Sequence, residues 1–160
     1  GNGVGTEIMN KYFSEVLGVD KDILPFKKFL QSDVTNIKQV EDKSFDGVFC
    51  FEVIEHLDKD KQKLLLKEID RISKKGFVIG SVNKYGSNFI QNTEIYKGDR
   101  NQFHKKELTV GDFGEIAIEF KKKGYKIELI GSFYKEEEQI FIMDLLNNDS
   151  YCNYLKVLKK

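Results

Sequence analysis

Short apolar runs alternate with amphipathic stretches along this chain. The runs are rich in β-branched and aromatic residues and have about the length of strands; they are Val16–Val19, Phe29–Leu30, Phe45–Ile54, Phe77–Val82, Ile127–Phe133 and Ile140–Leu146. Strands that alternate with helices favour parallel pairing, so the pattern predicts a doubly wound α/β sheet. Val48–Val53 is apolar nearly throughout, which is typical of a central strand buried on both faces.

Helical periodicity appears between these runs. A short amphipathic helix is predicted over Thr6–Phe13. Leu65, Ile69 and Ile72 fall on one stripe of a longer helix, which we expect to begin after Asp58 as N-cap and to end before Gly76.

The C-terminal part predicts one more helix and a hairpin. Thr109 and Asp112 have the spacing of a capping box, and Gly124 is a typical residue just past a helix end. Only Lys135–Glu138 separates the last two predicted strands, near 126–134 and 139–147. That spacing indicates an antiparallel hairpin at the end of a mostly parallel sheet.

Composition narrows the classes of protein. The 160 residues suit one domain, and 26 basic residues balance 26 acidic ones. A binder of nucleic acid that neutralises phosphates is usually basic, so we expect no nucleic-acid partner. No apolar run is long enough for a membrane helix and no signal peptide is visible, so we expect a cytoplasmic protein without a membrane span. Cys50 and Cys152 have no metal-binding spacing, and Cys50 is interpreted as a small core residue.

A glycine-rich loop and two acids suggest a ligand site. Gly1-Asn2-Gly3-Val4-Gly5 opens the first helical segment, where glycines let a backbone approach a ligand; a flexible tail is the alternative interpretation. Asp20 ends the next predicted strand and Asp33 the one after it. Each acid could instead serve only as a cap or turn residue. All would lie at the carboxyl edge of the sheet, where such folds bind ligands.

The segment Ser44–Leu57, SFDGVFCFEVIEHL, resembles a known family. It is similar to class I S-adenosylmethionine-dependent methyltransferases of the small-molecule or glycan type, in which a strand of this kind runs into Glu-His-Leu before a helix. Together with the glycine loop, Asp20, Asp33 and the hairpin, the resemblance covers nearly the whole chain. It implies a Rossmann-like fold, S-adenosylmethionine (SAM) as cofactor and no metal.

The resemblance also implies the cofactor-binding residues. The backbone at Gly1 and Gly3 would run past the methionine moiety of the cofactor, and Asp20 would bind the ribose. Asp33 and Val34 would contact adenine. Phe51 and Glu52 would flank the methyl-transfer site.

One departure from the family concerns the first strand. The strand that normally precedes the glycine loop is missing, and the chain starts at Gly1 rather than Met. We therefore expect a single methyltransferase-like domain over residues 1–160 that is incomplete at its N-terminus. Its second and fourth family strands would lack the partner between them.

Two histidines are the candidates for a catalytic base. Imidazole is suited to take up a proton near neutral pH. His56 follows the fourth family strand, and His104 ends a long irregular stretch that also supplies Asn83 and Tyr85 as candidate acceptor-binding residues. A packed structural role for His56 and a surface position for His104 are the alternatives.

The predicted function is transfer of a methyl group from SAM to a small polar acceptor, such as a sugar or glycan precursor. A non-catalytic binding module with this fold is one alternative. A nicotinamide-dependent oxidoreductase is another, but the G-x-G-x-G spacing and the terminal hairpin argue against it.

Overall fold

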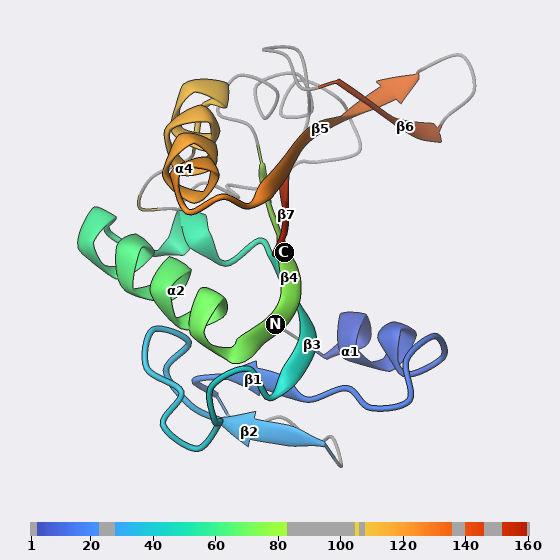
Figure 1. The fold of residues 1–160 in the computed structure, drawn as a ribbon. Coiled ribbons are helices and arrows are strands. Elements are labelled where there is room, and N and C mark those ends of the chain that lie inside the picture. The colour runs from blue at the N-terminus through green and yellow to red at the C-terminus, as the bar shows by residue number, and fades with distance from the viewer. Residues whose placement is uncertain are drawn as a thin grey trace.

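The strands of the described chain form two sheets (Figure 1). The computed structural model describes residues 3–22, 28–82, 105, 108–135, 140–145 and 152–159. The smaller sheet pairs β1 (Gly18–Asp20) with β2 (Phe29–Gln31) in parallel. The larger sheet has the order β3, β4, β7, β5, β6; the bounds are β3 Phe45–Phe51, β4 Ser73–Val82, β5 Lys126–Lys135, β6 Ile140–Leu145 and β7 Cys152–Leu158.

The pairing directions confirm the predicted α/β class. β3 and β4 are parallel, and helix α2 (Lys59–Ile72) connects them. β5 and β6 pair antiparallel, as the short spacing between them predicted. The sheet is therefore built from parallel strands at one side and a C-terminal antiparallel hairpin at the other.

Strand β7 was not predicted from the sequence. It lies between β4 and β5 and is antiparallel to both, so the hairpin does not pair with β4 directly. Asn153, Leu155 and Val157 are buried, whereas Tyr154 and Lys156 are only partly buried. This two-residue alternation is the signal of a strand, but Asn153 and Lys156 interrupt the apolar run that a search for continuous hydrophobicity needs.

Side-chain caps begin the two longer helices as predicted. The Asp58 carboxylate accepts a hydrogen bond from the Lys61 backbone N–H at 3.0 Å at the start of α2. Helix α4 (Val110–Lys122) begins with the Thr109–Asp112 capping box, and Gly124 follows its end with φ of 85°. These caps form because they need only residues a few positions apart.

Two predicted boundaries were wrong. The first helix, α1, is Val4–Met9 rather than Thr6–Phe13. Gly76 does not follow the end of α2: the chain passes from Ile72 straight into β4, and Gly76 lies within that strand with φ of 154°. A Cβ atom on Gly76 would lie 2.1 Å from the Val157 carbonyl oxygen, so the residue serves the pairing of β4 with β7.

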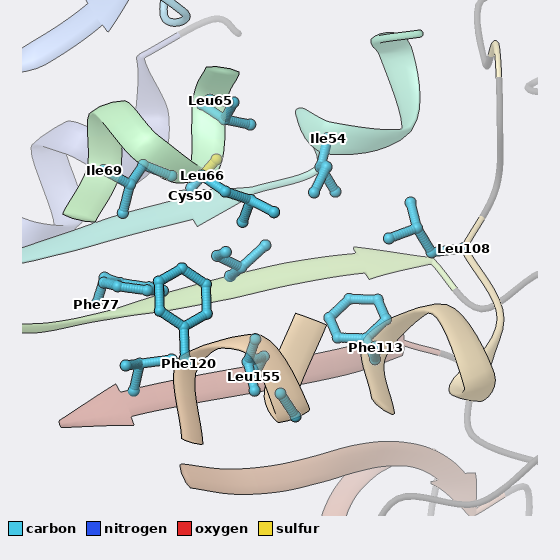
Figure 2. Close-up of a cluster of buried hydrophobic side chains, with 13 residues drawn as sticks. Cys50, Ile54, Leu65, Leu66, Ile69, Phe77, Leu108, Phe113, Phe120 and Leu155 are labelled. Atoms are coloured by element: carbon cyan, nitrogen blue, oxygen red, sulfur yellow. The ribbon is translucent and has the colours of Figure 1, made fainter. Parts of the chain in front are cut away.

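The main core fills the space between the large sheet and helices α2 and α4 (Figure 2). Leu65 and Ile69 come from α2, and Phe113 and Phe120 from α4. The Phe120 ring meets the ring of Phe77 on β4 edge to face, with centroids 5.0 Å apart. Cys50 is buried here as predicted, and burial raises the pKa of its thiol to about 12, with the Glu55 carboxylate adding to the shift.

The prediction that Val48–Val53 is buried on both faces was wrong. Cys50 is the buried residue of β3, while the side chains of Phe49 and Phe51 are 46% and 42% exposed. Helices α2 and α4 cover one face of the sheet. On the other face the Phe49 ring contacts the rings of Phe51 and of Phe13, which follows α1.

A second cluster joins the small sheet to the large one. Ile37, Val40 and Ile72 form its buried part, and Val19 of β1 and Val48 of β3 pack against it. No strand of the described residues lies between β1 and β3: β1 pairs with β2, and β3 pairs with β4. The sequence predicted this lack of a partner.

Candidate functional site

The glycine loop leads into α1 through a left-handed turn. Gly3 is the N-cap residue of α1 with φ of 80°, a conformation that glycine adopts without strain. α1 packs on β1, since a Cβ on Gly18 would lie 3.1 Å from the Thr6 hydroxyl. The turn therefore leads into a helix that lies against the first described strand.

Asp20 is the last residue of β1. Its carboxylate accepts a hydrogen bond from the Asp22 backbone N–H at 3.2 Å. An ionised carboxylate at a strand end can accept hydrogen bonds from sugar hydroxyls.

Asp33 lies two residues beyond β2, whose last residue, Gln31, pairs with Asp20. The Ser32 backbone N–H donates to the Asp20 carbonyl oxygen at 2.9 Å, which aligns the ends of β1 and β2. One carboxylate oxygen of Asp33 accepts from the Thr35 backbone N–H at 2.9 Å and from its hydroxyl at 2.7 Å. These bonds lower the pKa of Asp33 and give it the turn role that was one of its two interpretations. The predicted adenine contact of Asp33 and Val34 stays a prediction.

The end of β3 is fixed by an unusual backbone conformation. Glu52 has φ of 54°, in the left-handed region that residues with a Cβ rarely adopt. Its N–H donates to the Gly80 carbonyl oxygen at 2.9 Å, which ties the end of β3 to β4. Strain of this kind often accompanies functional sites, and here it turns the chain at the carboxyl edge of the sheet.

Glu55 is fully buried directly after β3. It lies in the 3-10 helix η1 (Ile54–His56), and its carboxylate accepts a hydrogen bond from the Ser81 hydroxyl at 3.0 Å. Within the described part of the chain, its other carboxylate oxygen and both amide atoms of buried Asn153 have no hydrogen-bond partner. Sequence reasoning missed this cluster, because its residues come from η1, β4 and β7, which lie far apart in the sequence.

His56 is partly buried in the same turn. Its backbone N–H donates to the Val53 carbonyl oxygen at 3.1 Å, and the Glu55 carbonyl oxygen accepts from the Lys105 N–H at 2.9 Å. Four predicted site residues lie outside the described residues: Gly1, Asn83, Tyr85 and His104.

The structure thus forms two groups of predicted site residues. Asp20 and Asp33 share the carboxyl end of the small sheet, and Phe51, Glu52 and His56 share that of β3. Both groups follow parallel strands, and carboxyl ends of parallel strands are where α/β folds bind ligands.

Residues 1–79 match a family described as methyltransferase domain, a region that contains both groups. Among curated proteins, none matches the sequence significantly.

Solved structures share the fold. A SAM-dependent methyltransferase from Archaeoglobus fulgidus aligns with a TM-score of 0.72 at 20% identity over 99% of this chain and 82% of its own. A SAM-dependent "possible histamine N-methyltransferase" from Thermotoga maritima gives 0.61 at 20% identity over 82% of this chain, which spans 64% of that protein. The small RNA methyltransferase HEN1 gives 0.60 at 20% identity over 81% of this chain and 16% of its own.

The solved structures confirm the predicted Rossmann-like fold, and the family match over residues 1–79 agrees with the predicted resemblance to methyltransferases. Of the helices in the described ranges, none has the length and apolarity to cross a membrane.

Proposed function

We propose that this chain binds SAM at the carboxyl edge formed by β1, β2 and β3, and that the protein transfers the methyl group to a small polar acceptor. A sugar or glycan precursor is the first acceptor class to test. The observation that carries the proposal is the succession of the Gly3 turn, Asp20, Asp33 and the Phe51–Glu52 strand end within the matched residues 1–79.

The described residues suit the chemistry of this cofactor. SAM supplies a methyl group that is already activated on a positively charged sulfur. The Gly3 turn lets the backbone approach a ligand, and Asp20 would accept hydrogen bonds from the ribose hydroxyls. Asp33 and Val34 would contact adenine, while Phe51 and Glu52 would lie beside the methionine end.

Acceptor activation would fall to residues near the end of β3 and in the following loops. His56 or His104 would accept a proton from the acceptor as general base. Asn83 and Tyr85 would bind the acceptor. The protein's main contribution would then be to hold acceptor and methyl group in line and to exclude water.

Calorimetric titration with SAM and, separately, with NAD tests the proposal. We expect binding of SAM but not of NAD. Asp20→Ala should weaken SAM binding by about 1–3 kcal/mol, since it removes an ionised acceptor of two hydrogen bonds. Asp22→Ala is the matched control, because it removes an exposed acid from the same turn and should change the affinity by less than about twofold.

Each other outcome has a defined meaning. Binding of NAD would favour the oxidoreductase, and binding of neither cofactor would contradict the proposal. SAM binding without methyl transfer in a screen of sugars, amines and RNA would favour a non-catalytic binding module. Transfer to RNA alone would contradict the small polar acceptor.

A further inference from the structure

Four aromatic rings form a row across the sheet face that α2 and α4 leave uncovered. Successive ring centroids of Phe13, Phe49, Phe51 and Tyr154 are 5.6, 6.0 and 5.8 Å apart. Phe49 and Phe51 belong to β3, and Tyr154 belongs to β7. Side chains alternate along a strand, so Phe51 and Tyr154 point away from the core that holds Cys50 and Leu155.

The last two rings of this aromatic row, Phe51 and Tyr154, pack on Gly80 of β4. Phe51 and Gly80 are register partners, and so are Gly80 and Tyr154. A Cβ on Gly80 would lie 2.6 Å from the Tyr154 ring and 2.8 Å from the Phe51 ring. The two rings therefore close over the glycine from both sides and meet nearly edge to face, at 87°.

The position of this ring pair suits a cation. Phe51 is the last residue of β3 and 42% exposed, and it is followed by the carboxylate-bearing Glu52. The face of an aromatic ring carries negative charge density and attracts cations within about 6 Å. The Glu52 carboxylate accepts a hydrogen bond from the Cys152 thiol at 4.0 Å, two residues before Tyr154 on β7. A negative charge at this place favours a positively charged group over a neutral one of the same shape.

We propose that Phe51 and Tyr154, seated on Gly80, contact the sulfonium of SAM and distinguish it from the neutral sulfur of S-adenosylhomocysteine. This inference rests on the proposed function and adds Tyr154 and Gly80 to the site. The charged substrate form is thereby held more tightly than it would be by aliphatic side chains, and the product loses this contact when its sulfur becomes neutral.

The test compares the affinities for SAM and S-adenosylhomocysteine by calorimetry. Phe51→Leu and Tyr154→Leu should each weaken SAM binding about threefold or more, with little change for S-adenosylhomocysteine. Tyr154→Phe keeps the ring and should retain the wild-type ratio of the two affinities. Phe49→Leu is the matched control, because its ring is equally exposed on the same strand but does not lie on Gly80.

A fluorinated ring separates the loss of the cation contact from a folding defect. Trifluorophenylalanine at position 51 keeps the shape of the side chain but removes the negative charge density of its face. It should lower the affinity for SAM selectively. An unchanged ratio in this variant and in Tyr154→Leu would overturn the inference while leaving SAM binding by the wild type intact. Wild-type protein that binds neither compound would contradict the proposed function itself.

Discussion

Glu52 holds a backbone conformation that costs free energy. Its φ of 54° brings Cβ close to the backbone, a strain of about 1–3 kcal/mol for residues other than glycine. The surrounding contacts maintain it: the Glu52 N–H bonds to Gly80, and the preceding ring of Phe51 packs on the same glycine. A conformation kept at such a cost, at the end of a strand in the candidate site, agrees with a role in shaping that site.

Glu52→Gly should therefore give a more stable protein than Glu52→Ala. Glu52→Gly relieves the strain, partly offset by the greater backbone entropy of glycine in the unfolded state, for a net gain of about 0.5–1 kcal/mol over Glu52→Ala. Both variants lose the same carboxylate, so their difference in urea unfolding isolates the backbone term. Equal stabilities would show that the conformation is not strained.

Two glycines, one inside helix α4 and one just after it, have different backbone conformations. Gly114 lies inside the helix, and Gly124 follows its end with φ of 85°. A Cβ atom would meet nothing within 4 Å at either position. The two sites therefore differ in backbone conformation but not in available space.

Alanine should have opposite effects at these two sites. Gly114→Ala should stabilise the protein by about 0.5–1 kcal/mol, because glycine weakens a helix interior. Gly124→Ala should destabilise it by about 1 kcal/mol, because alanine is strained at positive φ. Thermal unfolding of the two variants measures both effects, and a change of the same sign at both positions would refute the argument from φ.

Arg71 connects α2 to the segment that follows the small sheet. Its guanidinium contacts Glu68 at 2.7 Å and Asp42 at 2.6 Å and donates to the carbonyl oxygens of Ile37 and Val40. Glu68 also accepts from the Ile37 N–H at 2.7 Å. Together with the apolar cluster around Ile72, this network attaches the β1–β2 part of the candidate site to the large sheet.

The network should make stability depend on pH at the acidic end. Hydrogen bonds from Arg71 hold the pKa of Glu68 below its ordinary value of 4.5. The stabilisation is fully present above that unfolded-state value and is lost as the pH falls through the lower folded-state pKa. Urea unfolding between about pH 5 and pH 3 should show a steeper loss for the wild type than for Glu68→Gln. Glu119→Gln, an exposed position on α4, should keep the wild-type slope.

Much of the fold could be predicted from the sequence because it depends on local contacts. The caps of α2 and α4 and the β5–β6 hairpin depend on residues a few positions apart. The family resemblance of Ser44–Leu57 predicts the candidate site at the ends of β1, β2 and β3, which lie within the matched residues 1–79, and these site residues stay a prediction.

Contacts between distant residues decided the rest. β7 lies between β4 and β5 although it follows both in sequence. The Glu55 carboxylate accepts a hydrogen bond from the Ser81 hydroxyl, 26 residues further along the chain. Neither the exposed face of β3 nor the seating of Phe51 and Tyr154 on Gly80 follows from the local pattern. An apolar run specifies that a segment can be buried, whereas the neighbours that it pairs with in space determine which of its faces is covered.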